Sequence, residues 1–392
     1  MRLLVTNIKT LAGIADEGVL RLQGAEMKSL RTLSDAWLLV ENGKISAFGR
    51  MQNMPSCGFS VDETVDAQGG TVLPSWCDPH THIVYAGSRE GEFVDKIMGL
   101  SYAEIARRGG GILNSADLLH TLSEDELYRQ ALRRAQEIML KGTGCVEIKS
   151  GYGLNTADEV KMLRVIRRLK ESVPMRVVST FLGAHAVGRQ YGHYEYVDVI
   201  INEMLPEVGR ERLADYVDVF CDEGFFTPED TDRILEAAAR WGLKPKIHVD
   251  ELAATGGLPV AVKHGALSVD HLENMPESEF AILKDSQTMP TVLPGTSFFL
   301  NMPYAPARKM LDYGLGVAVA SDYNPGSTPS GDMKFVVSLA CIKMRLLPQA
   351  AINAATLNAA YAMGLSGEYG SITPGKAANF FITEPIPSVN YI

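Results

Sequence analysis

Two histidines one residue apart, His80 and His82, end an apolar run that begins at Leu73. Side chains alternate along a β-strand, so residues i and i+2 share a face and two imidazoles at a strand end can reach the same metal ion. Taken alone the spacing is a weak signal, because histidine pairs also serve in cores and turns. A metal site is therefore predicted only if further ligands follow other strands.

Further polar side chains stand where later apolar runs end. His248 closes one run, His271 closes the next, and Asp322 follows a run near residue 320. Each could instead have a structural role. A lone histidine is more often a hydrogen-bonded structural residue, and a lone aspartate more often caps a turn or a helix. The two adjacent histidines, one of these two further histidines and the aspartate form a set of four donors.

Three imidazoles and one carboxylate suit Zn²⁺ or iron and are too rich in nitrogen for Mg²⁺ or Ca²⁺. The sequence therefore predicts one Zn²⁺ or Fe³⁺ per chain, held in a catalytic site. The five cysteines form no C-x-x-C pair, which excludes a zinc ribbon and indicates reduced thiols.

The elements that must position these residues alternate between short β-branched runs and helical segments, which is typical of parallel βα units. Eight strands are predicted, over residues 71–76, 144–148, 176–182, 216–220, 244–249, 266–270, 288–293 and 316–320. Eight parallel strands predict an α/β fold, a (β/α)₈ TIM barrel whose reactive face lies at the carboxyl ends of its strands. The connection over 86–122 is too long for a simple turn and is predicted to elaborate the active site.

Short alternating runs near both ends of the chain predict a second, smaller domain. Residues 2–7 and 36–48 alternate in this way, and Asn42-Gly43 is a strong hairpin signal. Residues 369–382 repeat the pattern, so the two ends are expected to pair. We predict a discontinuous β-sandwich domain of residues 1–66 and 367–392, and a barrel over 67–366.

Composition limits the possible partners. The 392 residues carry a formal net charge of -10 with no block of lysine or arginine, so neither nucleic acid nor an anionic membrane is an expected partner. No apolar run approaches the roughly 20 residues of a membrane span, and the first residues lack the core of a signal peptide. A cytoplasmic protein that acts on a small molecule is expected.

The motifs resemble those of the amidohydrolase superfamily, in D-P-H-T-H at 78–82, in the histidines of the fifth and sixth strands, and in S-D at 321–322. Within it, segments 87–93, 109–112, 147–154, 181–185, 248–251 and 322–327 resemble the imidazolonepropionase family of histidine degradation. The resemblance covers almost the whole chain. It implies a hydrolase of cyclic amides that converts 4-imidazolone-5-propanoate to N-formimidoyl-L-glutamate, and it implies a homodimer.

The resemblance also implies roles for single residues. The implied metal ligands are His80, His82, His248 and Asp322. The implied substrate contacts are Arg89, Tyr152, His185, Glu251, Asn324, Gly326 and Ser327. The implied catalytic residues are Glu251, His271 and Asp322.

Of these, His271 would orient the attacking water or stabilise the oxyanion, and Glu251 would relay a proton to the leaving nitrogen. Which carboxylate or imidazole is the effective base stays open at this point. Arg89 would bind the propanoate carboxylate in a bidentate fork, whereas a surface ion pair with Glu90 or Glu92 is the alternative.

Other interpretations stay open as well. Lys149, if carboxylated, could bridge two metal ions as in dinuclear cyclic amidases, and a metal count would identify that case. A deaminase of a nitrogen ring on the same barrel would release ammonia. A catalytically silent scaffold of this fold should have lost ligands, and none of the predicted set is missing.

Overall fold

The computed structural model describes residues 1–54, 60–100, 104 and 108–391. Its larger sheet has eight strands in the order β13-β12-β11-β10-β9-β8-β7-β6, and all neighbours run parallel. The strands are β6 (Trp76–Asp78), β7 (Thr143–Lys149), β8 (Arg176–Ala184), β9 (Tyr216–Cys221), β10 (Lys244–Val249), β11 (Ser268–His271), β12 (Met289–Val292) and β13 (Ala318–Val319). The two ends of the sheet meet where Thr81 bridges Tyr323 in parallel. The predicted (β/α)₈ barrel is confirmed.

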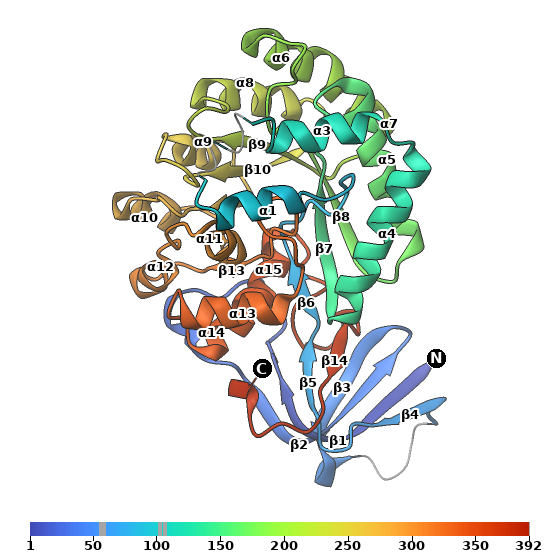
Figure 1. The fold of residues 1–392 in the computed structure, drawn as a ribbon. Coiled ribbons are helices and arrows are strands. Elements are labelled where there is room, and N and C mark those ends of the chain that lie inside the picture. Colours follow the sequence, from blue (N-terminus) through green and yellow to red (C-terminus); the bar gives the residue numbers. More distant parts are fainter. Residues whose placement is uncertain (55–59, 101–103, 105–107, 392) are drawn as a thin grey trace.

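The barrel strands are buried along their length, as in β7, β9 and β12, because helices cover the outer face of a parallel sheet. Figure 1 shows these helices around the strands. They are α4 (Glu124–Leu140), α5 (Thr156–Ser172), α6 (His193–Val199), α7 (Leu205–Glu211), α8 (Pro228–Ala239), α9 (Gly257–Lys263), α10 (Phe280–Lys284), α11 (Pro294–Leu300), α12 (Ala307–Tyr313), α13 (Met333–Ile342), α14 (Pro348–Ala355) and α15 (Leu357–Ala362). In the described part of the chain, no helix has the length and apolar character needed to cross a membrane.

Side-chain caps start the helices that the sequence marks most clearly. Ser123 accepts a hydrogen bond from the backbone N–H of Glu126 at the start of α4, and Thr227 accepts one from Asp230 at the start of α8. Such caps satisfy backbone donors that a helix leaves unpaired at its first turn. Both helices therefore begin at the residue whose side chain caps them.

The two ends of the chain form the smaller sheet, where blue and red segments lie together in Figure 1. Its order is β14-β5-β1-β2-β3, with β4 also on β1. The strands are β1 (Arg2–Ala12), β2 (Thr32–Glu41), β3 (Lys44–Arg50), β4 (Glu63–Asp66), β5 (Thr71–Pro74) and β14 (Phe380–Ile382). Asn42 and Gly43 turn the β2–β3 hairpin with φ of 50° and 76°, as a two-residue hairpin requires. The expected discontinuous β domain is present as one six-stranded sheet.

The predicted first barrel strand needs a correction. Residues 71–76 are two strands, because β5 pairs with β1 and β14 in the small sheet and only β6 pairs with β7 in the barrel. One apolar run thus contributes a strand to each sheet. Because the run is buried in both sheets, its composition does not show where the chain passes from the small sheet to the barrel. The predicted domain boundaries stay predictions.

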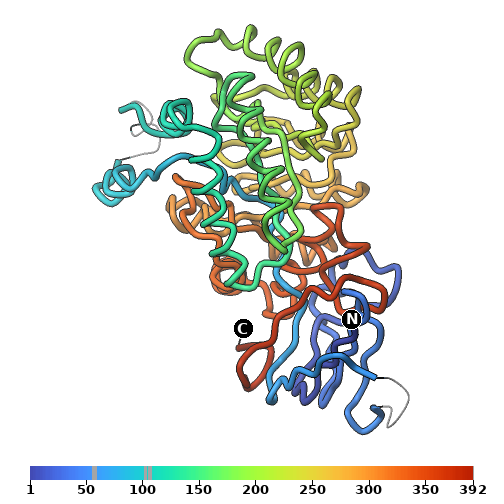
Figure 2. The backbone as a smooth tube through the Cα atoms, turned by 90° about the vertical axis from the view of Figure 1, so that its right-hand side faces the viewer, coloured from blue at the N-terminus to red at the C-terminus, as the bar shows by residue number. Residues whose placement is uncertain are grey.

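The long connection after β6 carries two helices, α1 (Glu90–Ile97) and α3 (Ile112–His120). In Figure 2 this segment projects from the side of the barrel. Several apolar side chains of α1 are exposed, including Val94 at 57% and Ile97 at 67%. The helix therefore buries fewer of its apolar side chains than the helices that pack on the strands.

Candidate metal centre and substrate cavity

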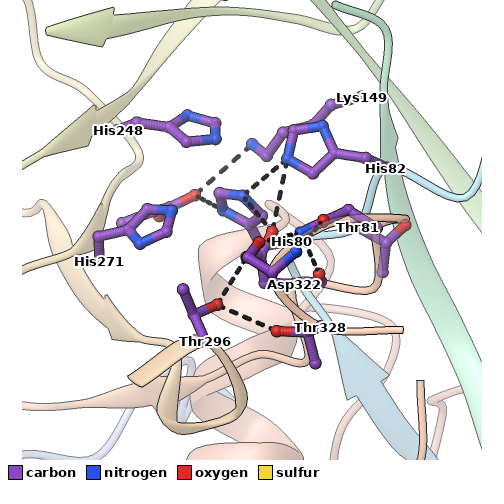
Figure 3. Close-up of polar contacts among 12 residues, drawn as sticks. His80, Thr81, His82, Lys149, His248, His271, Thr296, Asp322 and Thr328 are labelled. Atoms are coloured by element: carbon purple, nitrogen blue, oxygen red, sulfur yellow. Dashed lines mark hydrogen bonds and ion pairs between the residues drawn. The ribbon is translucent and has the colours of Figure 1, made fainter. Parts of the chain in front are cut away.

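Four of the predicted residues converge at the carboxyl ends of the barrel strands (Figure 3). His80 Nε2 lies 3.2 Å from His82 Nε2, and each of these atoms lies 3.6 Å from Asp322 Oδ1. Zn–N distances of about 2.0–2.1 Å in a tetrahedral site place neighbouring ligand atoms about 3.3 Å apart. His248 joins the two histidines in a group whose donor atoms lie within 4.8 Å of one another. The spacing of the donors therefore fits one metal ion.

The protonation of these imidazoles also fits a metal ion. Burial lowers the pKa of His80, His82 and His248 well below 6.5, and neighbouring positive groups lower it further. The rings are therefore neutral, and a neutral imidazole offers a lone pair. Among the described residues, His248 Nε2 has no hydrogen-bond partner. A bound cation would satisfy this buried polar atom.

Asp322 is oriented by one hydroxyl group of α11 and one of its own loop. Its Oδ2 accepts hydrogen bonds from the Thr296 hydroxyl at 2.6 Å and from the Ser327 hydroxyl at 3.0 Å. Oδ1 is left to face His80 and His82. This division of the two oxygens leaves one of them for a metal ion.

His271 lies beside the donor set, between two carboxylates. Its Nδ1 is 3.6 Å from Glu251 Oε2 and 3.5 Å from Glu273 Oε2. Burial opposes a charge on His271, but Glu251 and then Glu273 raise its pKa overall, to about 10. Burial raises the pKa of Glu251 to about 8, although His271 opposes this shift. The pair therefore holds a proton next to the donor set.

A cavity of about 580 Å³ opens onto this group. Its wall includes every predicted substrate contact: Arg89, Tyr152, His185, Glu251, Asn324, Gly326 and Ser327. The remaining wall is mainly apolar, with Phe220 and Phe225 on one side and Phe93 and Phe299 stacked at 5.4 Å. A small ring with a polar arm is the kind of ligand that such a site takes.

Arg89 immediately precedes α1 and is only 8% exposed. It pairs with Glu92 at 2.5 Å. The ion pair that the sequence offered as an alternative is therefore present, but it is buried and does not lie on the surface. A Cβ atom on Gly326 would lie 2.1 Å from Arg89 Nη1. The absence of a side chain at Gly326 therefore makes room for the guanidinium.

Lys96 provides a second cation that the sequence analysis missed. Its amino group donates to the backbone carbonyl of Gly326 and lies 4.7 Å from the centre of the Phe299 ring. Burial, and then the charge of Arg89, lower its pKa to about 8. Lys96 lies about two helical turns beyond Arg89, but nothing in its local sequence distinguishes it from an exposed helix lysine.

Tyr152 and His185 form the wall next to His82. The imidazole of His185 stacks on that of His82 with 5.2 Å between ring centres, and Tyr152 lies 5.3 Å from His185. His185 Nδ1 donates to the Gly151 carbonyl at 2.9 Å, and burial lowers the pKa of His185 to about 4. Its Nε2 is thus a neutral acceptor. Glu159, also missed, shapes this loop by accepting the N–H groups of 151, 153 and 154.

Asn324 and Ser327 lie in the cavity wall, but their side chains serve the loop. The Asn324 amide oxygen accepts the backbone N–H groups of Gly326 and Ser327, and its amide nitrogen donates to the Asp322 carbonyl. Direct contact of these two side chains with a substrate stays a prediction.

Comparison with known proteins identifies the family of this chain. A model described as "Amidohydrolase family" matches residues 223–392. The imidazolonepropionase of Christiangramia forsetii is 57% identical over 394 residues, covering 100% of this chain and 95% of that protein. The imidazolonepropionase of Flavobacterium psychrophilum is 54% identical over 388 residues, covering 98% and 94%. The chain belongs to the imidazolonepropionase family of amidohydrolases.

More distant solved structures share the fold of this imidazolonepropionase family member. An atrazine chlorohydrolase of Arthrobacter aurescens TC1, complexed with zinc, has 18% identity and a TM-score of 0.69 over 96% of this chain and 86% of that one. A 5-methylcytosine deaminase of Klebsiella pneumoniae has 16% identity and a TM-score of 0.72 over 95% and 91%. The predicted superfamily and family, and with them a hydrolase of histidine degradation, are confirmed.

The sequence analysis missed the charged residues beneath the site. Glu147, Asp218, Lys246 and Asp270 are completely buried within strands β7, β9, β10 and β11. A signal for them exists, because a charged residue inside an otherwise apolar strand needs a buried partner. The sequence does not say which charge meets which.

Proposed function

We propose that this chain hydrolyses the cyclic amide of 4-imidazolone-5-propanoate to N-formimidoyl-L-glutamate, with one metal ion per chain held by His80, His82, His248 and Asp322. The observation that supports this most directly is the make-up of one cavity. Neutral nitrogen donors and a carboxylate line one part of it, and two cations, Arg89 and Lys96, line another. A ring that carries a carboxylate arm matches both parts.

A metal ion bound by these residues would polarise the ring carbonyl and lower the pKa of a water molecule to roughly 7. Its identity as Zn²⁺ or Fe³⁺ follows from the donor types, which suit both. A count of one is favoured over the dinuclear alternative by Lys149, which is surrounded by carboxylates. Carboxylation requires a neutral amine, and these neighbours raise the pKa of Lys149 although burial opposes the shift.

The chain's own residues would handle the protons. Charged His271 can donate a hydrogen bond to the oxygen that gains negative charge when the ring carbonyl is attacked. Glu251 can accept a proton from the attacking water in its ionised form, which a pKa of about 8 makes the minor form at neutral pH. Protonated Glu251 can then deliver a proton to the ring nitrogen that leaves. Because Glu251 and His271 share a charge network, they are expected to titrate as a pair.

The substrate would be oriented by its two ends. Arg89 and Lys96 would bind the carboxylate, while Tyr152 and His185 would contact the ring beside His82. The apolar wall would exclude water from the ring face, which strengthens the polar contacts.

The test presents 4-imidazolone-5-propanoate, generated in situ by urocanase, to the metal-loaded protein and follows the loss of its ultraviolet absorbance. Formation of N-formimidoyl-L-glutamate without ammonia is expected. Ammonia release would favour a deaminase, two metal ions per chain would favour the dinuclear alternative, and no turnover in a metal-loaded protein would favour a silent scaffold. A homodimer is part of the proposal, and mass measurement in solution tests it.

A further inference from the structure

Beneath the candidate metal ligands lies a buried ionic cluster that the proposed mechanism does not use. Its central residue is Lys149, the last residue of β7, which is completely buried. The Lys149 amino group is 2.7 Å from Asp218 Oδ2, 2.7 Å from Glu147 Oε1 and 3.5 Å from Asp270 Oδ2. In Figure 3 the lysine stands behind His82, and its amino group is turned towards the histidines.

The same two aspartate oxygens reach two of the candidate ligands. Asp270 Oδ2 accepts a hydrogen bond from His80 Nδ1 at 2.7 Å. Asp218 Oδ2 lies 3.0 Å from His248 Nδ1. The second distance is short enough for a hydrogen bond, but the N–H direction is off line in the present ring orientation. A small rotation of the His248 ring would complete it.

The other oxygen of each aspartate is fixed as well. Asp218 Oδ1 accepts the backbone N–H of His248 at 3.1 Å, and Asp270 Oδ1 accepts the Ser268 hydroxyl at 2.5 Å. A carboxylate that accepts the Nδ1–H of a neutral imidazole sets its tautomer and leaves the Nε2 lone pair for a metal ion. Asp270 and Asp218 thus set the tautomers of His80 and His248. The ammonium group of Lys149 contacts both aspartates.

We propose that Lys149 is a positioning residue for the metal site: it holds Asp218 and Asp270 so that His248 and His80 keep their Nδ1–H tautomers and present Nε2 to the metal ion. The inference rests on the proposed metal site and not on the identity of the substrate. Two buried carboxylates without a cation would repel each other and lose orientation. Lys149 offsets this repulsion without contacting a metal ion or a substrate.

The chain offers a matched control in Lys246. This lysine is also completely buried, lies on β10 between the strands of Asp218 and Asp270, and pairs with the same Glu147. Its remaining contacts are the carbonyl oxygens of Pro79 and Ala362, at 3.0 and 3.1 Å. Replacing Lys246 therefore removes a buried ammonium group of the same kind but leaves Asp218 and Asp270 with Lys149.

The experiment compares Lys149→Met, Lys246→Met and the unchanged protein, each stripped of metal and confirmed to be folded by circular dichroism. Zn²⁺ affinity is measured by competition with a chromophoric chelator, and imidazole tautomers of the metal-free proteins are read by ¹⁵N NMR. Lys149→Met is expected to weaken Zn²⁺ binding by roughly 10- to 100-fold, the scale found for outer partners of metal ligands. In this variant only, the ¹⁵N signals of His80 and His248 should show a mixture of the Nδ1–H and Nε2–H tautomers.

If Lys149→Met fails to fold, Lys149→Gln takes its place, because the amide removes the charge but keeps donors. A double-mutant cycle of Lys149→Gln with Asp270→Asn then tests the route of the effect. Losses in Zn²⁺ affinity that are clearly less than additive support action through Asp270. Fully additive losses, equal losses for Lys149 and Lys246, or unchanged Zn²⁺ affinity and tautomers in the Lys149 variant overturn the inference. Zn²⁺ affinity and imidazole tautomers are measured without a substrate. Failure of this inference can therefore be distinguished from failure of the proposed reaction.

Discussion

The donor set and α1 form opposite parts of the same cavity wall, and they are held in place in different ways. His80, His82, His248 and Asp322 stand at strand ends and are at most 2% exposed. Arg89 immediately precedes α1 and Lys96 lies on it, and this helix projects from the barrel and exposes Val94 and Ile97 to solvent. Strand ends fixed by a sheet and by buried carboxylates can hold a precise geometry, whereas a helix on a long connection can adjust.

The difference teaches how the work of the site is divided. Donors to a metal ion and groups that move protons must be placed to within a fraction of an ångström. Groups that attract a carboxylate can act through charge over a longer distance. Substitutions at the strand ends should therefore affect the chemical step, and substitutions on α1 should affect substrate binding.

The largest effect is expected for Asp322→Ala. It removes the oxygen donor and opens the cluster around His80 and His82. We expect metal retention to be lost and kcat to fall by more than the roughly 10²- to 10³-fold cost of removing one oxyanion donor. Elemental analysis after gel filtration and kcat measure the two effects. Full metal content with normal kcat would show that the metal ion is bound by other residues.

Glu251→Gln is expected to keep both metal content and fold, because Glu251 lies beside the donor set and not within it. Loss of a proton-transfer group should lower kcat by roughly 10²- to 10⁴-fold. KM should change little. A metal-loaded variant with near-normal kcat would assign the proton transfer to His271 or Asp322.

Arg89→Met is expected to act on substrate binding. A charge-assisted pair with a carboxylate contributes about 1.5–3 kcal/mol, so kcat/KM should fall by about 10- to 100-fold. Lysine at 89 should restore part of the loss, because it keeps the charge but not the planar fork. A propanamide analogue is the control: if both proteins prefer the acid to the amide equally, the carboxylate binds elsewhere.

Gly326→Ala tests the same site from the loop. The new Cβ would meet the Arg89 guanidinium, which is the end of a flexible side chain and can move aside. We expect unchanged thermal stability and a fall in kcat/KM of up to about 10-fold, because charge remains but the fork is misplaced. In combination with Arg89→Met the two losses should not add. Fully additive losses would show that Gly326→Ala does not act through Arg89.

The smallest effect is expected for Lys96→Met. With a pKa of about 8, Lys96 is charged below that pH and neutral above it, so its attraction for a carboxylate is lost as the pH rises. In the unchanged protein kcat/KM should therefore decline by about 2- to 5-fold on passing through pH 8, the scale of a partly solvated ion pair. The variant should lack this contribution, so the ratio of kcat/KM between the unchanged protein and the variant should fall towards 1 above pH 8. A step caused by Glu251, whose pKa is also about 8, is common to both proteins and cancels in this ratio. A ratio that stays constant across this pH range would assign the step to another group.

The sequence alone was enough to predict eight parallel strands, the small sheet built from both ends, and the residues that follow the strands. Each of these predictions rests on a local pattern: alternation, caps, and a polar residue at the end of an apolar run. Thr71–Pro74 marks the limit of this approach, because its burial is alike in either sheet and only pairing assigns it to the small one.

Tertiary structure alone decided how the charged residues pair. Lys149 and Lys246 look alike in the sequence, yet one reaches aspartates 69 and 121 positions away and the other reaches backbone carbonyls. Lys96 meets a carbonyl 230 positions along the chain. These contacts depend on the order and twist of strands around a closed barrel, since closure brings together side chains that no local pattern relates.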